Sequence, residues 1–296
     1  MADPARTARA MWTLFEPIHA VTYFAPEARG AFEEAGLRGF WRGYFAGRAA
    51  PLGPASAAVV TASFFNFAPA FVARAIPAVW DLISPEDALR TRLAGAEATL
   101  RDLLAGREAE AEVAAGLLWQ AIGELDFSGR VLAAANAALA VPGGDLSSGE
   151  SSSGESSSLA RLWQAATLLR EHRGDGHFAA LAAADIDGCE AVALRCCIDL
   201  RREDLQPVRG WTDEAWDNAL AGLADRGWVG ADGRLTSAGQ AAHDAVENAT
   251  DRAAARPWTR LGADATADLA GVLTPLAKAC AAVVPYPSPI GVPAPA

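Results

Sequence analysis

The sequence predicts a mainly α-helical protein built from two winged-helix-like halves, with one short β-wing in the C-terminal half. Apolar residues recur mostly at three- and four-residue spacing, which is the period of an amphipathic helix. Alanine is abundant and strand-favouring runs are few. In the second half, a helical pattern is followed by a short hairpin pattern and a long helix, which is the order of elements in a winged helix.

The first predicted domain, residues 1–144, contains only helical patterns. The clearest helix start is Ser84-Pro85-Glu86-Asp87, which combines an N-cap serine, a first-turn proline and two acids near the positive end of the helix dipole. The other helices are expected at about 7–19, 27–35, 37–49, 54–65, 70–82, 109–124 and 127–139.

Residues 145–158 form a predicted flexible linker, because this Ser/Gly/Glu segment has almost nothing that a core would bury. The second predicted domain, residues 159–284, follows it. The Pro-rich tail, residues 285–296, is expected to be extended, with Tyr286 and Ile290 as the side chains able to dock it.

The second domain begins with three expected helices. The first covers about 159–172 and is expected to break at Gly174. Asp175 then caps a short helix over 176–184, and Asp187 caps a third that extends to about Leu200. The four cysteines, Cys189, Cys196, Cys197 and Cys280, have no zinc-ligand spacing and are expected to be free buried thiols.

The winged-helix pattern follows. Thr212 caps a helix that ends at Gly227, Asp232-Gly233 supplies a hairpin turn, and a long helix covers about 237–255. Leu223-x-x-x-Gly227-Trp228-Val229 and Asp232-Gly-Arg-Leu-Thr-Ser-Ala-Gly239 resemble the wing of MarR-type regulators. The whole chain, including 16–24 and 172–177, is similar to an actinobacterial helix-turn-helix family labelled SalK-like, which implies a winged-helix relationship and little chemistry.

Charge argues against most polyanionic partners. The formal net charge is −11, so the surface as a whole repels nucleic-acid phosphates and anionic lipids. The candidate recognition helix, 212–226, has four acids and one base, which makes DNA an unlikely partner without excluding it. The start of the chain lacks a secretory signal pattern, and there is no run of 18 uninterrupted apolar residues, so we expect a cytoplasmic protein without a membrane span.

Residues 168–177 hold the strongest candidate site. His172, Arg173, Asp175 and His177 lie around two glycines, and histidine with carboxylate is a combination used in acid/base catalysis. In a catalytic reading, a histidine acts as general base, Asp175 orients it and Arg173 stabilises developing negative charge. The alternative is a structural corner, in which Asp175 caps a helix and the histidines bond to buried carbonyls.

A metal site is predicted from a weak internal repeat. Trp12…His19 in the first half echoes Trp163…His172 in the second, so a diverged duplication would bring His19 toward His172 and His177 as ligands of a divalent metal. Glu16 and His19 also have the i, i+3 spacing of helical carboxylate sites. Chance similarity of two alanine-rich segments, or a histidine bonded inside an aromatic core, explains the same residues.

The first half also concentrates aromatic residues. Tyr44, Asn66 and Arg42 are predicted to provide polar anchors in an aromatic pocket for a planar or hydrophobic small molecule or cofactor. The alternative is that these aromatic residues form only a core. Phosphate-loop, dinucleotide and common hydrolase motifs are missing from the sequence.

Together these patterns predict a small-molecule-binding winged-helix protein with a His/Asp/Arg site, either a metal-assisted or an acid/base enzyme of specialised metabolism. The alternative is a ligand-responsive MarR-like regulator that binds DNA. The sequence leaves open whether the protein is an enzyme, and a homodimer is a further expectation.

Overall fold

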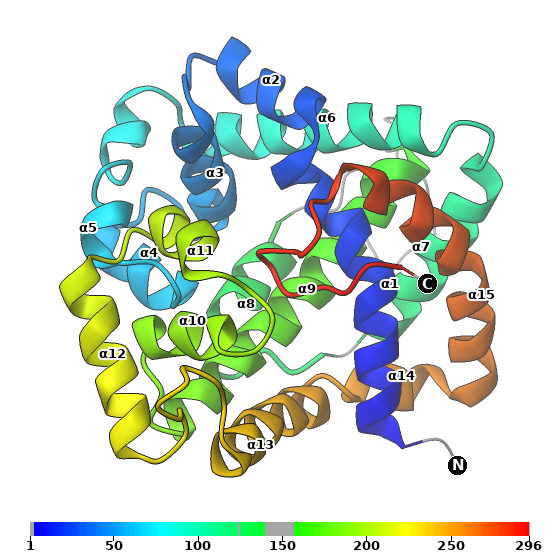
Figure 1. The fold of residues 1–296 in the computed structure, drawn as a ribbon. Helices are drawn as coiled ribbons and strands as arrows, with labels where there is room; N and C mark the ends of the chain where they lie inside the picture. The colour runs from blue at the N-terminus through cyan, green and yellow to red at the C-terminus, as the bar shows by residue number, and fades with distance from the viewer. Residues whose placement is uncertain (1–2, 124, 140–156, 296) are drawn as a thin grey trace.

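The computed structural model describes residues 3–123, 125–139 and 157–295, which form a helical assembly (Figure 1). The α-helices are α1 (Pro4–Phe24), α2 (Pro26–Glu34), α3 (Phe40–Ala49), α4 (Ala57–Phe64), α5 (Pro69–Val72), α6 (Pro85–Leu103), α7 (Glu108–Ile122), α8 (Val131–Ala137), α9 (Ser158–Ala183), α10 (Gly188–Cys196), α11 (Arg202–Arg209), α12 (Asp213–Asp225), α13 (Ser237–Ala253), α14 (Arg256–Leu261) and α15 (Ala263–Cys280). Short 3₁₀ turns are η1 (Ala50–Leu52), η2 (Ala78–Asp81) and η3 (Ala281–Val283).

Helix α9 lies at the centre of the fold. Its first half is apolar on every side, and from Leu159 to Leu169 every residue except Arg161 is buried. It packs against α1, α6, α7, α8 and α13 (Figure 1). Two expectations for this region were wrong, because α9 continues through Gly174, and Asp175 accepts a hydrogen bond from the backbone N–H of Ala133 on α8 instead of capping a new helix.

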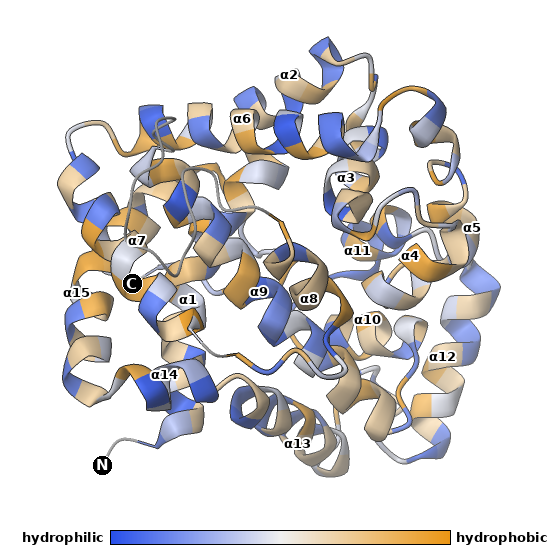
Figure 2. Ribbon diagram, turned by 180° about the vertical axis from the view of Figure 1, so that it is seen from behind, coloured by the Kyte–Doolittle hydropathy of each residue, from blue (hydrophilic) through white to orange (hydrophobic). Residues whose placement is uncertain are grey.

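The main hydrophobic core joins both sides of the predicted linker. Side chains of α1, α6 and α7 interdigitate with those of α9, α14 and α15, and these helices carry apolar residues on their facing sides (Figure 2). The two predicted domains therefore share one core. The linker itself lies outside the described residues except for Ser157 and Ser158, where α9 begins.

One helical segment in the described part of the chain, Ala263–Val283, is long and apolar enough to cross a membrane. Here α15 packs along α1 and α7, and its residues Leu269, Leu273 and Leu276 are fully buried in the main core. These contacts account for the apolar residues on the buried face of α15.

A second core consists largely of aromatic rings from α3, α4 and α5. Phe45, Phe64, Phe67 and Phe71 are buried there, with centroids of neighbouring rings 5.3 to 6.4 Å apart, the closest pair being Phe45 and Phe67. Edge-to-face contacts of this kind add to the free energy of burial.

Helices α10–α13 contain a helix-turn-helix. Helix α11 ends at Gly210, which has a left-handed φ of 75°, and Thr212 caps α12 as predicted by accepting from the N–H of Ala215. After α12, a turn carries an isolated antiparallel bridge between Val229 and Leu235. The described residues contain no β-strand, so the predicted β-wing is reduced to this bridge and a winged helix is not confirmed in either half.

The Pro-rich tail packs against the body of the protein. Val284 and Val292 are buried against Ala20 and Tyr23 of α1, with Ile290 partly buried beside them, and the tail crosses in front of α1 (Figure 1). Of the two predicted docking residues, Ile290 contacts this cluster and Tyr286 is exposed. Residues 285–295 therefore lie along the surface next to α1.

Candidate functional site

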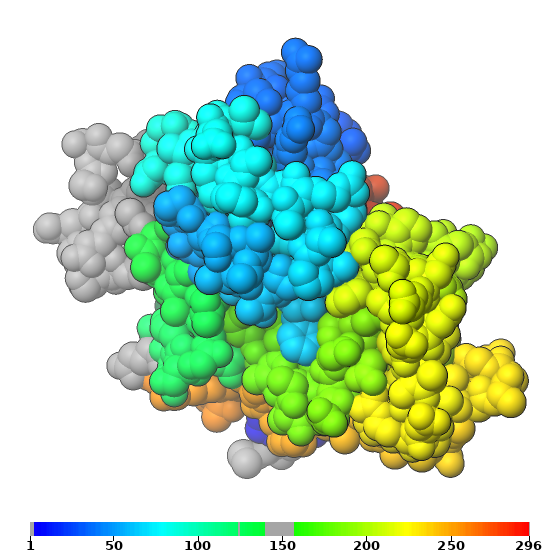
Figure 3. Space-filling model, turned by 90° about the vertical axis from the view of Figure 1, so that its left-hand side faces the viewer, coloured from blue at the N-terminus to red at the C-terminus, as the bar shows by residue number. Residues whose placement is uncertain are grey.

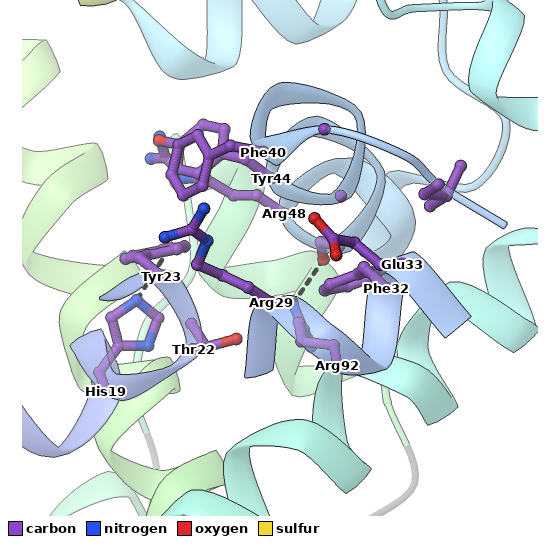
Figure 4. A pocket seen from close by; sticks show the side chains of 14 residues that line it. His19, Thr22, Tyr23, Arg29, Phe32, Glu33, Phe40, Tyr44, Arg48 and Arg92 are labelled. Atoms are coloured by element: carbon purple, nitrogen blue, oxygen red, sulfur yellow. Dashed lines mark hydrogen bonds between the residues drawn. The ribbon is translucent and has the colours of Figure 1, made fainter. Parts of the chain in front are cut away.

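A narrow cavity lies between α1, α2, α3 and α6 (Figure 4). Arg29 and Glu33 of α2 and Phe40 of α3 surround its mouth, where the Arg29 side chain is exposed and lies over the Phe40 ring, 5.5 Å from the centroid. The hollow encloses about 500 Å³ including its opening to solvent, but only about 30 Å³ is wide enough for the centre of a water molecule. That inner space holds about two waters, so a larger molecule needs Arg29 or Phe40 to move.

Glycine spacing on α3 sets the width of the cavity. Gly43 and Gly47 face Phe32 of α2, and a Cβ on Gly47 would lie 2.5 Å from the Phe32 ring. Real Cβ atoms do not approach other atoms this closely, so only glycine allows α2 and α3 to pack at this distance. This close packing places the rings of Phe40 and Tyr44 beside the α1 residues that form the floor.

The floor of the cavity contains a buried histidine, His19, each of whose ring nitrogens contacts a hydroxyl group. His19 Nε2 lies 2.9 Å from the Tyr23 hydroxyl (Figure 4), and its Nδ1 lies 2.9 Å from the Thr167 hydroxyl on α9. Burial and three nearby arginines hold the pKa of His19 well below its usual range, so the ring is neutral at pH 7. A neutral imidazole donates through one nitrogen and accepts through the other, which satisfies both contacts.

Two buried arginines, Arg48 and Arg92, also line the cavity. Arg48 donates from Nη1 to the Tyr44 hydroxyl at 3.0 Å and stacks on Phe64, with its guanidinium carbon 4.1 Å from the ring centroid. Arg92 donates to the carbonyl of Gly47 at 3.1 Å and to Asn136 Oδ1 at 3.2 Å. Burial lowers the pKa of Arg92 to about 10, which still leaves it charged at pH 7.

An ion-pair network lies on the α9 side of Arg48. Glu171 accepts a hydrogen bond from Arg170 at 2.7 Å and lies 3.6 Å from Arg48 Nε. Burial opposes ionisation of Glu171, but Arg170 and Arg48 outweigh it and lower its pKa. Glu16 accepts from Trp12 at 2.8 Å and lies 3.5 Å from Arg170, and burial raises its pKa. The helix is not interrupted at Pro17, so Glu16 and His19 belong to the same continuous α1.

The predicted catalytic residues lie on different faces of α9. Arg173 and His177 face α13, where Arg173 donates to Asp251 at 2.7 Å and His177 Nδ1 lies 3.0 Å from the Thr250 hydroxyl. Burial lowers the pKa of His177 to about 4. These contacts join α9 to α13.

Asp175 faces α8, and the backbone of His172 contacts the residue that precedes α8. The carbonyl of His172 accepts from Arg130, and Asp175 Oδ2 accepts from the Ala133 N–H at 2.9 Å. Burial lowers the pKa of His172 to about 3 and raises that of Asp175 to about 6. The four residues thus contact separate elements, and the structure does not bring them to one centre.

His19, the third predicted metal ligand, contacts Tyr23, Thr167 and Trp163. Neither His172 nor His177 is among these contacts. Within residues 3–123, 125–139 and 157–295, no group of three His, Cys, Asp or Glu side chains has the arrangement needed for a metal ion. All four cysteines are free as expected, with Cys189 and Cys280 buried.

Of the three predicted pocket anchors, one lines the cavity. Tyr44 stacks on Phe40, with centroids 5.8 Å apart, and lies on the cavity wall. Arg42 is exposed on α3 and Asn66 lies in the loop after α4, so neither contributes to the lining. Sequence reasoning missed Arg92 and Arg29, although the repeat Gly39, Gly43, Gly47 is the one local signal of a close-packed helix face.

The helix-turn-helix turn docks on the aromatic cluster next to this cavity. Trp211 Nε1 donates to the carbonyl of Asn66 at 3.1 Å, and the carbonyl of Arg209 accepts from the Ala68 N–H at 2.9 Å. The Arg209 guanidinium lies 4.8 Å from the centroid of Phe67, whose ring is 5.7 Å from Tyr44. Residues near 55–85 and 200–225 accordingly lie against each other at the surface (Figure 3).

The outer face of the helix-turn-helix is acidic. Asp213, Glu214, Asp217 and Asp225 of α12 are exposed. The nearest arginine, Arg202, is already paired with Asp213 at 2.9 Å and with Asp217 at 2.7 Å. This surface therefore presents negative charge where a DNA reader presents positive charge.

The fold defines a helical protein with a helix-turn-helix whose turn packs beside an arginine- and aromatic-lined cavity. Residues 8–287 match the model of a helix-turn-helix family. Because this match spans most of the sequence, the chain belongs to that family. Comparison with curated proteins found no match, and neither did comparison with solved structures.

Proposed function

We propose that this helix-turn-helix protein binds a small molecule in the cavity between α1, α2, α3 and α6. The observation that carries the proposal is the composition of the lining, in which aromatic rings surround two buried arginines that have unpartnered nitrogens. Ligand sites combine apolar walls with a few placed polar groups in this way. Because the Arg29 side chain at the mouth is exposed, it can move aside to admit a ligand without disturbing the core.

A thermal-shift screen of a diverse metabolite library tests this function. Compounds that bind in the cavity should raise the melting temperature of the wild-type protein and lose most of that effect in Tyr44→Leu, which removes a cavity wall. Trp80→Phe is the matched control, because Trp80 belongs to the same aromatic cluster but does not line the cavity. A library without a single stabilising compound, or hits unaffected by Tyr44→Leu, would contradict the proposal.

The second candidate is a ligand-responsive regulator that binds DNA. Membership of a helix-turn-helix family favours it, and so does the contact between the turn and the aromatic cluster, since Phe67 touches both Arg209 and Tyr44. A ligand that moves Tyr44 would then bias the position of the turn. The resemblance of the turn after α12 to a MarR-type wing, and of the chain to the SalK-like family, belongs to this same proposal.

The acidic face of α12 opposes DNA binding through the usual recognition surface. A mobility-shift assay on the DNA upstream of the protein's own gene, at low and high salt, decides the question. A DNA-binding protein should show affinity that falls steeply with salt, and Arg234→Ala in the exposed turn should weaken it. Absence of any salt-dependent complex would remove this candidate and leave ligand binding alone.

An enzyme using His172, Arg173, Asp175 and His177 receives less support, because these residues contact two different helices. A divalent metal held by His19, His172 and His177 requires a rearrangement that brings the three rings together. Metal analysis of the purified protein, compared with His172→Ala and His177→Ala, tests this reading directly.

A further inference from the structure

We propose that the ligand of the cavity is a small aromatic carboxylic acid, bound with its carboxylate at Arg48 and Arg92 and its ring beside Phe40 and Tyr44. This inference deepens the proposed function, on which it rests. It is carried by an imbalance of charge in the buried lining, by unpartnered guanidinium nitrogens and by the shape of the aromatic wall.

The charge imbalance favours an anion. Three arginines line the cavity, Arg29, Arg48 and Arg92, against one carboxylate, that of Glu33, which is exposed at the mouth. Inside, Glu171 is the carboxylate nearest to Arg48, and it already accepts a shorter bond from Arg170. No carboxylate in the described part of the chain forms an ion pair with Arg92, whose acceptors are a backbone carbonyl and an amide oxygen.

Buried charge without a counter-charge is unfavourable, because desolvation is not offset by a close opposite charge. The Arg48 side chain is only 5% exposed, and Arg92 is 7% exposed. Arg48 has Glu171 as a counter-ion at 3.6 Å, whereas Arg92 forms no ion pair with a carboxylate of the described residues, so a ligand carboxylate would supply the opposite charge that Arg92 lacks. The two arginines would repel a cation, so we expect the site not to bind amines.

Hydrogen-bond capacity points to the same class. Nε and Nη2 of Arg48 and Nε of Arg92 are buried and have no hydrogen-bond partner. A carboxylate has two acceptor oxygens, and its planar geometry matches the guanidinium fork. The Tyr23 hydroxyl and the neutral His19 ring in the same floor add donors and acceptors without adding charge.

The wall selects a planar ring. Phe40 and Tyr44 are stacked at an interplanar angle of 28°, and the Tyr23 ring lies 5.2 Å from Tyr44. The Arg29 side chain extends toward Phe40 and Tyr44 (Figure 4), so its movement away from Phe40 would open this aromatic surface to the mouth. The narrow inner space admits a carboxylate head, while the wider mouth accommodates the ring. Bulky polyanions do not fit this shape.

Isothermal titration calorimetry of the full-length protein with benzoate, 4-hydroxybenzoate and indole-3-carboxylate tests the inference. At least one acid should bind, and its neutral amide should bind about thirtyfold more weakly or worse, because a buried charge-assisted pair is lost. Arg48→Met should weaken the acid by a similar factor. Arg90→Met, which removes an exposed arginine of α6, should leave affinity unchanged.

If Arg48→Met fails to fold, Arg92→Met replaces it, because Arg92 is the other proposed carboxylate ligand and its present acceptors are neutral. Amides that bind as tightly as the acids, or acids that bind Arg48→Met or Arg92→Met like the wild type, would overturn the carboxylate assignment. If inorganic phosphate binds as tightly as the acids, the inference that the ligand carries an aromatic ring is wrong. If no acid binds while Tyr44-dependent neutral hits exist, the ligand class is wrong and the proposed function stands.

Discussion

The docking of the helix-turn-helix turn makes a sharp prediction about Gly210→Ala. Gly210 ends α11 with a φ of 75°, and a Cβ there would lie 2.3 Å from Cβ and 2.4 Å from Cγ of Phe71. Gly233, in the turn after α12, is a matched control because its φ is 73° and nothing lies within 4 Å of the position of a Cβ. The two substitutions therefore share the backbone strain and differ in the clash.

The expected free energies follow from these geometries. A left-handed φ costs an alanine about 1–2 kcal/mol, and this alone applies to Gly233→Ala. At Gly210, Phe71 is buried among other rings, with Trp41 only 4.9 Å away, so relieving the clash adds about 1–3 kcal/mol of overpacking strain. A shift of the turn instead breaks its hydrogen bonds to Ala68 and to the carbonyl of Asn66. We expect Gly210→Ala to lose about 2–5 kcal/mol in total.

Urea denaturation followed by circular dichroism measures both free energies of unfolding. Gly210→Ala should unfold at clearly lower urea than Gly233→Ala. Equal losses, within about 0.5 kcal/mol, would refute the argument that the turn is packed tightly on the aromatic cluster, since only the shared strain would then remain.

Three further predictions concern ionisable groups of α9 whose pKa values are shifted in the folded protein. Glu171→Gln should lower the free energy of unfolding by about 3–5 kcal/mol, because it leaves Arg170 and Arg48 without their carboxylate. The control, Glu110→Gln at an exposed ion pair, should change that free energy by less than about 1 kcal/mol. Comparable losses for the two variants in urea melts would contradict the ion-pair network. The folded pKa of His177, about 4, is below the unfolded value of about 6.5, so its contribution is complete above pH 6.5 and is lost as the pH falls toward 4. His177→Gln should therefore flatten the decline of stability in that window by ~1.4 kcal/mol per pH unit, and an unchanged slope in pH-dependent urea melts would count against burial of a neutral ring. The folded pKa of Asp175, about 6, is instead above its unfolded value, so its ionisation destabilises the fold as the pH rises from 4 to 6. Asp175→Asn should be more stable than the wild type by about 1–3 kcal/mol at pH 7 and similar to it at pH 4; an effect of equal size at both pH values would show that charge is not the cause.

Local signals predicted most helix starts correctly. Ser84, Asp187 and Thr212 cap α6, α10 and α12 as expected, each accepting a backbone N–H of the first turn. Capping depends on the side chain and the few residues after it, so a sequence pattern is sufficient. The predicted break at Gly174 was wrong because burial on all sides of α9 stabilises the helix beyond what glycine propensity disfavours.

Gly176 shows what local signals cannot reveal. It appears in the sequence as a helix breaker, but in α9 it allows Arg130 and Ala253 to approach, since a Cβ there would lie 2.8 Å from Arg130 Nη1. The need for this glycine comes from residues 46 and 77 positions away. The same limitation applies to Asp175 and His177, whose partners were unknown until α8 and α13 were placed against α9.

The sequence by itself determined the helical class, the start of α12 at Thr212 and the acidic character of that helix, because periodicity, caps and charge are local or additive properties. Only the tertiary structure decided that the two halves share one core and that α1, α2, α3 and α6 enclose Arg48 and Arg92 beside Tyr44. The pKa of a buried ionisable group depends on the groups around it, and those groups come from segments far apart in the chain. The candidate site therefore moved from residues 168–177 to the cavity next to α3.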